Sequence, residues 1–227
     1  MHTTSIAELL QPFLTSANDQ RLTTNDLQNI STYIDLLLRW NARINLSAIR
    51  KEEEIVTRHF GESLFAASHL FPTRATQGQP PKPALSEVEG AVHLIDVGSG
   101  PGFPGIPIKL WAPEIQVTLI ESNQKKATFL REVIRTLTLT NINVFPNRAE
   151  HYESKPAQAV TLRAVERFET ILPTAARLVV PGGRLALLIS EAQLPQVRAL
   201  TPEFKWSDPI AIPQSSNRRL LIGTRAS

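Results

Sequence analysis

The sequence predicts an α/β fold with a mostly parallel sheet and an antiparallel last strand, preceded by an N-terminal helical lobe. The first observation is an apolar run at residues 92–97 that leads into a glycine-rich segment, as in a buried parallel strand followed by a loop and a helix. The second is the alternation of strand-like and helix-like segments from residue 116 to residue 189. The third is a helical apolar periodicity within residues 1–70.

Length and composition indicate a globular protein with one sizeable core. The chain has 227 residues, of which 42% are hydrophobic and 20% charged. No apolar run approaches the roughly 18 residues of a membrane helix, and the N-terminus MHTTSIAELL lacks a signal-peptide core. We therefore expect a cytoplasmic protein, without a membrane partner and monomeric.

Composition also excludes several classes of site. The chain has no cysteine, so it has no disulfide, no thiolate metal site and no cysteine nucleophile. It shows no other metal-ligand pattern, no G-x-S-x-G and no pair of carboxylates at glycosidase spacing, so neither a metal enzyme nor a hydrolase is expected. The net charge of +3 and the pI near 9.4 are only weak evidence for a nucleic-acid partner.

Residues 1–70 predict the helical lobe. The segment Ser5–Glu8 has the spacing of a capping box and predicts a short helix over residues 6–14. Thr23–Asp26 has the same form ahead of a longer helix, and a third helix is expected over about Lys51–Leu70. The longer helix carries one apolar stripe, formed by Leu27, Ile30, Ile34, Leu37 and Leu38.

The rest of the chain divides into a linker and a core. Residues 71–91 are rich in proline, glycine and polar residues, which predicts an exposed linker or insertion. Residues 92–227 predict the sheet domain. After the first strand we expect strands at 116–120, 142–145, 158–162 and 184–189, helices at 123–137 and 169–178, and a closing pair at 210–212 and 220–222 with one strand antiparallel.

The spacing of the glycines indicates which nucleotide the loop binds. A dinucleotide fingerprint places its third glycine where this chain has Phe103. The pattern is instead Asp96-x-Gly98-x-Gly100-x-Gly102, which resembles motif I of the Rossmann-like class I methyltransferases, whose ligand is S-adenosylmethionine (SAM). A glycine-rich turn of an ordinary α/β protein and a dinucleotide site are the alternatives for this stretch alone.

Other candidate residues follow the later strands. Glu121 ends the second strand, where a carboxylate can accept both ribose hydroxyls of a nucleoside. The turn Asn147–Glu150 follows the third strand, where an adenine ring would lie. Arg163 follows the fourth strand and would point into the cleft, to hold the SAM carboxylate or a substrate phosphate. A surface glutamate, a plain loop and a salt bridge to a neighbouring acid are the respective alternatives.

Basic residues suggest a surface for phosphates, although a solvated helix face explains them equally well. They lie in the helix at 123–137, in the helical lobe and near the C-terminus: Lys125, Lys126, Arg131, Arg135, Arg39, Arg43, Arg50, Arg58, Arg218 and Arg219. His59 is a lone histidine beside Phe60, and we expect it to be structural rather than catalytic.

Together these residues resemble one family, the bacterial small-subunit rRNA guanine-N-7 methyltransferases known as RsmG, formerly GidB. The resemblance is carried by WNARINL at Trp40–Leu46, by Arg58-His59 followed by Glu62-Ser63, and by the loop Asp96–Pro107. Asn147-Arg-Ala-Glu150 and Leu162-Arg163-Ala164 follow in the family's order.

The resemblance implies a class I SAM-dependent methyltransferase that makes 7-methylguanosine in 16S rRNA, with small-subunit rRNA or the small ribosomal subunit as its partner. It implies SAM contacts at Gly98, Phe103, Ala149, Glu150 and Arg163. The glycine motif adds Gly100, and the position at the end of the second strand adds Glu121. No residue is expected to transfer a proton, because nitrogen 7 of guanine carries a free lone pair. Arg163 is expected to be a positioning residue.

Two departures from the family pattern leave alternatives open. Ser190-Glu191 stands where the family commonly has Lys-Gly, and the insertion at 72–91 is unusually long. A catalytically silent rRNA-binding or assembly factor is therefore one alternative. A methyltransferase acting on another substrate is the second, and an NAD-dependent oxidoreductase, disfavoured by Phe103, is the third.

Overall fold

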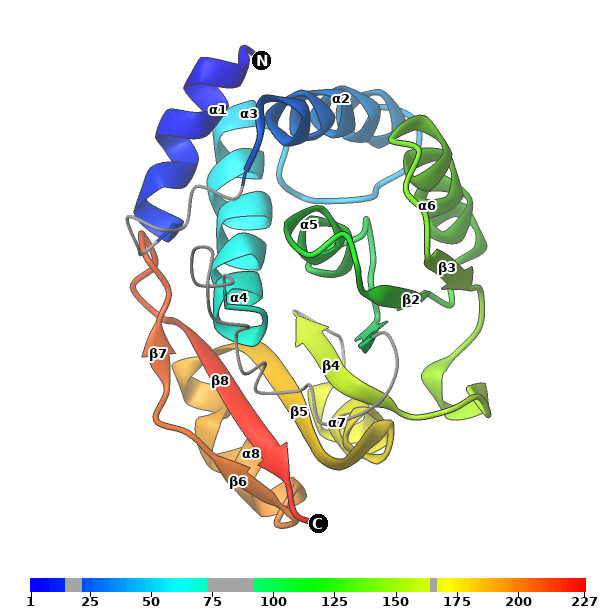
Figure 1. Ribbon diagram of the computed structural model, residues 1–227, viewed down its shortest axis with the longest axis vertical. Helices are drawn as coiled ribbons and strands as arrows, with labels where there is room; N and C mark the ends of the chain where they lie inside the picture. The colour runs from blue at the N-terminus through cyan, green and yellow to red at the C-terminus, as the bar shows by residue number, and fades with distance from the viewer. Residues whose placement is uncertain (15–21, 73–91, 164–166) are drawn as a thin grey trace, which may run out of the picture.

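The computed structural model describes residues 1–14, 22–72, 92–163 and 167–227. The predicted linker at 71–91 therefore lies outside the described residues apart from its first two positions. Within the described part, one sheet separates two layers of helices (Figure 1). The helices α2, α4, α5 and α6 lie on one side of the sheet, and α7 and α8 lie on the other.

The sheet has the order β3-β2-β1-β4-β5-β8-β6, with the short β7 also paired to β8. The first five strands pair in parallel, whereas β6, β7 and β8 pair antiparallel. The strands are β1 (His93–Val97), β2 (Gln116–Ile120), β3 (Ile142–Phe145), β4 (Ala157–Arg163), β5 (Val179–Ser190), β6 (Phe204–Trp206), β7 (Ile210–Ala211) and β8 (Arg218–Arg225). The predicted α/β fold with an antiparallel last strand is confirmed.

The strand predictions differ from the structure mainly near the C-terminus. The predicted β2 and β3 match the structure, and β4 and β5 extend beyond their predicted bounds. Both strands of the closing pair are antiparallel, where we expected one. The helix α8 (Leu194–Leu200) and β6 were not predicted, because segments of seven and three residues are too short to show periodicity.

The helical layer on the lobe side is assembled from short and long segments. It comprises α1 (Thr3–Leu10), the 3-10 turn η1 (Gln11–Phe13), α2 (Thr24–Asn41), α3 (Glu52–Glu54), the π-helix η2 (Ile55–Gly61), α4 (Glu62–Leu70), α5 (Gly105–Trp111) and α6 (Gln124–Thr136). The remaining segments are η3 (Ala149–His151), α7 (Phe168–Arg177) and η4 (Glu191–Gln193).

One predicted capping box is present and the other is wrong. Thr23 accepts a hydrogen bond from the Asp26 amide, and the Asp26 side chain accepts from the Thr23 amide, so α2 begins as predicted. In contrast, α1 begins at Thr3, and Ser5 lies inside it. A tertiary contact holds the chain just before α1: the Ser31 hydroxyl donates to the Met1 carbonyl oxygen at 2.8 Å.

The predicted third helix contains a π-helical segment. Residues 55–61 form η2 between the α-helical segments α3 and α4. The segment ends at Gly61, where a Cβ atom would lie 2.6 Å from the Phe13 ring, so only glycine fits there. π-Helical turns are rare and occur frequently at functional sites. This one carries Arg58 and His59.

Two hydrophobic cores lie on the two faces of the sheet. Because strand side chains alternate between faces, Leu94 of β1 belongs to the lobe-side core, whereas Ile95 and Val97 belong to the core under α7 and α8. The lobe-side core runs without a break from α1 to α6. The helical lobe is thus packed onto the same sheet that carries the glycine loop.

Candidate active site

The candidate residues converge on one edge of the sheet. The strands β2, β1 and β4 are neighbours and parallel, and Val97 aligns with Ile120 on one side and with Leu162 on the other. The glycine loop, Glu121 and Arg163 therefore follow or end adjacent strands at the same carboxyl edge. Open α/β sheets bind their ligands at this edge.

The glycines of the loop have different roles. Gly98, Gly100 and Gly102 all have positive φ, at 68°, 56° and 97°. A Cβ atom on Gly100 would meet only the Gly98 carbonyl oxygen, at 3.9 Å, so the space over this residue is open. A Cβ atom on Gly102 would instead overlap the Tyr33 hydroxyl. Gly100 thus offers bare backbone to a ligand, whereas Gly102 allows the lobe to pack against the loop.

Glu121 joins the end of β2 to the glycine loop. Its side chain is buried, with 7% of the residue exposed. One carboxylate oxygen accepts from the Gly100 amide at 2.8 Å, and the other accepts from the Asn123 amide at 2.7 Å. The carboxylate therefore lies beside the open space over Gly100. A carboxylate has about four acceptor positions, so two hydrogen bonds leave it capacity for hydroxyl donors.

Asp96 is fully buried beneath the loop. One carboxylate oxygen accepts from the Thr161 hydroxyl at 2.8 Å, and the other accepts from the Gly105 amide at 3.1 Å. Burial raises the pKa of Asp96 to about 6, although these hydrogen bonds favour the charged form. Asp96 thus fixes the start of α5 and the neighbouring β4 relative to the loop.

Phe103 lies between two rings of the helical lobe. Its ring stacks on Tyr33 with a centroid distance of 5.3 Å and on His59 with a distance of 4.6 Å, and Phe60 contacts it edge-on. Only 4% of Phe103 is exposed. The Tyr33 hydroxyl also donates to the Pro101 carbonyl oxygen. The structure therefore places the Phe103 ring in the lobe-side core, where it attaches the loop to the lobe.

Arg163 forms a buried ion pair, which was the alternative interpretation of its sequence position. Its Nη2 lies 2.9 Å from Glu62 Oε2 and donates to the Arg58 carbonyl oxygen at 2.5 Å. Arg218 of β8 donates to the same Glu62 oxygen at 2.8 Å. Glu62 and Arg163 are 2% and 8% exposed. Arg163 Nε is buried and has no hydrogen-bond partner among the described residues.

His59 is held neutral beside this ion pair. Its Nδ1 lies 3.2 Å from Arg163 Nη1, and its Nε2 lies 2.8 Å from the Ser47 hydroxyl. A guanidinium group only donates, so Nδ1 accepts and the proton is assigned to Nε2. Burial and then the charge of Arg163 lower the pKa of His59 to about 2. The expected structural role fits this arrangement.

The turn after β3 forms η3. Ala149 is buried, whereas Glu150 is exposed. The Asn147 side chain accepts from the Arg148 amide at 2.8 Å and fixes the approach to the turn. The first amides of such a turn lack partners within it.

Sequence reasoning missed Tyr33 and Glu62 as site residues and misjudged the C-terminal arginines. Tyr33 belongs to the apolar face of α2, and this pattern contains no signal for its hydrogen bond to the loop. Arg218 was expected to contact phosphate but pairs with buried Glu62. Arg219 pairs with Glu191 at 2.8 Å, so the acidic departure from the family pattern compensates a neighbouring cation.

The part of the chain that the structure describes contains neither a metal-binding cluster nor a membrane-spanning helix. Among these residues, no group of three or more histidine, aspartate or glutamate side chains is arranged to hold a metal ion. Within the same residues, no helix has both the length and the apolar character needed to cross a bilayer.

The sequence matches a known family over most of its length. The profile of the family described as rRNA small subunit methyltransferase G matches residues 26–220. A ribosomal RNA small subunit methyltransferase G of Xanthomonas campestris is 35% identical over 193 residues, which cover 84% of this chain and 82% of the relative. A protein of the same name from Xylella fastidiosa is 35% identical over 196 residues, with coverage of 85% and 84%.

Solved structures with a similar fold are more distant in sequence. Magnesium protoporphyrin IX methyltransferase from Synechocystis, solved with bound SAM, has a TM-score of 0.61 at 13% identity and covers 87% of this chain and 97% of that one. A ribosomal protein L11 methylase from Lactobacillus delbrueckii has a TM-score of 0.55 at 12% identity, with coverage of 74% and 80%. At these identities the likeness concerns the fold alone.

Proposed function

The chain belongs to the rRNA small subunit methyltransferase G family, and we propose that it transfers a methyl group from SAM to ring nitrogen 7 of a guanine in small-subunit (16S) rRNA. The observation that carries the proposal is the open space over Gly100 beside the Glu121 carboxylate. SAM, when bound, supplies a methyl group attached to a positively charged sulfur atom.

Several residues at the carboxyl edge fit this cofactor. The positive φ angles of Gly98 and Gly100 expose backbone to a close ligand. Glu121 has spare acceptor positions for ribose hydroxyls. The amides at Ala149 and Glu150 begin a turn and suit the edge of an adenine ring. In this proposal Phe103 contributes backbone only, because its ring is buried between Tyr33 and His59.

Arg163 acts as a positioning residue in this proposal. Its buried Nε, which has no hydrogen-bond partner among the described residues, supports a contact with the carboxylate of the cofactor's amino acid end. Its two Nη atoms hold the lobe through Glu62, His59 and the Arg58 carbonyl. Arg163 therefore connects the placement of the cofactor to the placement of the lobe.

Methyl transfer to this position needs positioning rather than proton transfer. Nitrogen 7 of guanine has a free in-plane lone pair, so no base has to remove a proton before attack. The protein must hold the target nitrogen in line with the methyl carbon, at roughly 3 Å. Neutral His59 already engages both of its ring nitrogens, in keeping with a role in alignment. The target base has to be presented unstacked for its edge to reach the cleft.

The proposal is tested directly on the product. We expect 7-methylguanosine in small-subunit rRNA from cells that contain the protein and its absence from cells that lack it. The purified protein is expected to transfer labelled methyl groups from SAM to unmodified small-subunit rRNA or to small subunits. If neither substrate is methylated, the protein would be a catalytically silent rRNA-binding or assembly factor. If a different molecule is methylated, the proposed substrate would be wrong.

A pair of glycine variants tests the cofactor site. Gly100 and Gly182 both have positive φ, at 56° and 73°, and a Cβ atom has open space at both. Gly100→Ala and Gly182→Ala therefore carry similar backbone strain. Only Gly100→Ala is expected to weaken SAM binding, by at least tenfold in calorimetry. Equal SAM affinity in both variants would show that SAM does not bind over Gly100. A thermal shift with NAD but not with SAM would indicate an oxidoreductase.

We also propose that the protein acts as a monomer in the cytoplasm. Sedimentation equilibrium is expected to give a single species near the chain mass of 25.2 kDa. A concentration-dependent rise toward twice that mass would contradict the monomer.

A further inference from the structure

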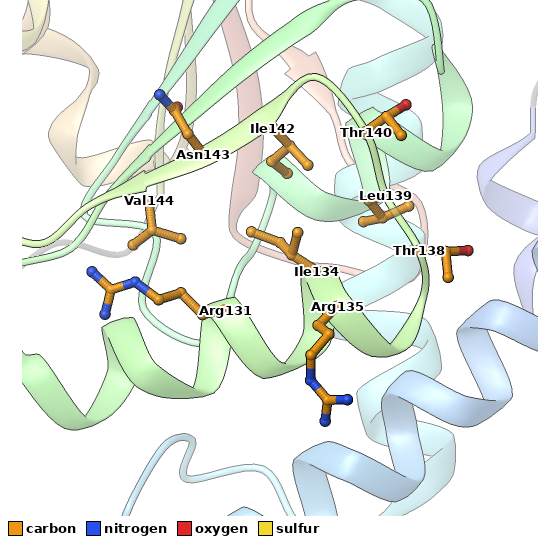
Figure 2. Close-up of a pocket in the computed structure, with 9 residues that line it drawn as sticks. All are labelled: Arg131, Ile134, Arg135, Thr138, Leu139, Thr140, Ile142, Asn143 and Val144. Carbon is orange, nitrogen blue, oxygen red and sulfur yellow. The ribbon is translucent and has the colours of Figure 1, made fainter.

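A groove lies between α6 and β3, on the flank of the sheet (Figure 2). Its volume is about 470 Å³. Figure 2 shows Ile134 of α6 facing Val144 of β3 across the groove, with Arg131 extending beside Val144. The lining consists of Arg131, Ile134, Arg135, Thr138, Leu139, Thr140, Ile142, Asn143 and Val144.

The floor of the groove is aliphatic and only half buried. Ile134, Leu139, Ile142 and Val144 pack on the lobe-side core and remain partly exposed. In the described sheet β3 is the outer strand and pairs only with β2, so its other edge faces the groove. Threonine and asparagine side chains around this floor can hydrogen-bond to hydroxyl groups.

The rim of the groove carries positive charge that no described residue neutralises by an ion pair. Arg131 and Arg135 are exposed, and no carboxylate among the described residues lies within ion-pair distance of either. The acid of this helix, Glu132, accepts instead from the Trp40 indole at 3.0 Å. Residues at i and i+4 of a helix lie about 5–6 Å apart, so the two arginines share one side of α6.

We propose that this groove binds a strand of the rRNA substrate that flanks the target nucleotide. The arginines contact its phosphates or stack on its bases, and the aliphatic floor receives a base or ribose. An apolar protein segment would cover the floor but leave both cations without partners. A second copy of this chain packed through the same face would bring Arg131 and Arg135 toward like charges. The inference rests on the proposed function, which supplies the RNA.

The position of the groove suits such a strand. The helix α6 begins one residue after its N-cap Asn123, which follows Glu121 at the carboxyl edge. With a rise of 1.5 Å per residue, Arg131 lies about 10 Å and Arg135 about 16 Å from the start of α6. The groove thus runs along the flank of the sheet, from Val144, one residue before the end of β3, to the turn at residues 138–140, away from the carboxyl edge.

The test compares two double variants of equal charge. Arg131→Ala with Arg135→Ala removes the cations at the groove. Arg177→Ala with Arg198→Ala removes two exposed arginines from α7 and α8, on the other side of the sheet. Binding to naked small-subunit rRNA is measured across a salt series, together with KM and kcat for methyl transfer. SAM affinity and melting temperature verify that both variants fold and retain the cofactor site.

The groove variant is expected to weaken rRNA binding and raise KM for rRNA about tenfold, with kcat and SAM affinity unchanged. The slope of log K against log salt should fall by about 1.4, because two single-strand phosphate contacts are lost. In the α7/α8 variant, rRNA affinity and KM should stay within twofold of those of the natural protein.

Equal losses in both variants, or in neither, would overturn the proposal. A loss seen with assembled subunits but not with naked rRNA would indicate a protein partner and would also overturn it. Failure of the natural protein to methylate rRNA would count against the proposed function, whereas the binding comparison tests the groove.

Discussion

The two faces of the sheet are built differently. Under α7 and α8 the core is mainly aliphatic, with residues such as Leu172 and Val160 fully buried. On the lobe side, the core contains the stacked rings of Tyr33, Phe103 and His59 and a buried ion pair. A buried ion pair contributes little net stability but costs much when one partner is removed. The two faces therefore differ in how they meet the proposed site: the apolar face includes Ala149 of the turn after β3, whereas the lobe side holds Phe103 of the loop and Arg163 through aromatic and polar contacts.

The largest expected effect is on the lobe side, at Glu62. Glu62→Gln leaves two arginines beside a buried neutral group, and we expect a loss of about 3–5 kcal/mol in the free energy of unfolding. Methyl transfer should fall as well, because Arg163 loses its anchor. Urea unfolding and the transfer assay measure the two effects. Glu62→Asp retains the charge and should recover part of both; a Gln variant as stable as the natural protein would contradict the role of the ion pair.

A cavity on the opposite face provides the contrast. Leu172 is fully buried under α7, and Leu172→Ala should cost about 3 kcal/mol through lost burial and an empty cavity. SAM affinity at a temperature where the variant is folded should be largely unchanged, because this core includes Ala149 of the proposed SAM contacts, whereas Phe103 belongs to the lobe-side core. A weaker SAM affinity would show that the two faces are coupled and would remove the distinction between them.

The pH dependence of stability sharpens the contrast on the lobe side. The pKa of His59 is about 2 in the folded protein, below the 6.5 of an exposed histidine, so below pH 6.5 only the unfolded chain gains the proton. The free energy of unfolding therefore decreases as the pH is lowered below 6.5. Relative to His59→Gln, the decrease approaches about 1.4 kcal/mol per pH unit. The raised pKa of Asp96 acts in the opposite direction in both proteins and cancels in this difference. Unfolding curves between pH 7 and pH 5 measure the effect, and parallel pH profiles would contradict a buried neutral histidine.

The smallest expected effect is at Tyr33. Tyr33→Phe keeps the ring stacked on Phe103 and removes the hydroxyl that donates to Pro101. We expect a loss of about 1 kcal/mol in unfolding free energy. If this hydrogen bond also holds the glycine loop, SAM affinity should fall a few-fold in calorimetry. A loss of stability with unchanged SAM affinity would limit Tyr33 to packing.

The sequence predicts those features that depend on neighbouring residues. The capping box at Thr23–Asp26 and the strands β2 and β3 follow from local chemistry and apolar runs, and the structure confirms them. The start of α1 at Thr3 was predicted wrongly, and the residue Met1 just before it contacts Ser31, 30 positions away. Local signals contain no information about such distant partners.

The same limit applies to the candidate site. The parallel topology brings the glycine loop, Glu121 and Arg163 to one edge, and this followed from the order of the strands. The pairing of Arg163 with Glu62 spans 101 positions and was weighed only as an unspecified salt bridge. The burial of Phe103 depends on two rings from different helices, which the glycine pattern does not reveal.

The π-helix η2 gives the chain a particular sensitivity to deletions. A π-helical turn holds one residue more than an α-helical turn, and here the Glu62 amide donates to the Thr57 carbonyl oxygen, five positions back. The Arg58 carbonyl oxygen instead accepts from Arg163 Nη2. A one-residue deletion that made this segment a regular α-helix would return the Arg58 carbonyl to the hydrogen bonds of the helix, and Arg163 would lose one of its acceptors in the lobe.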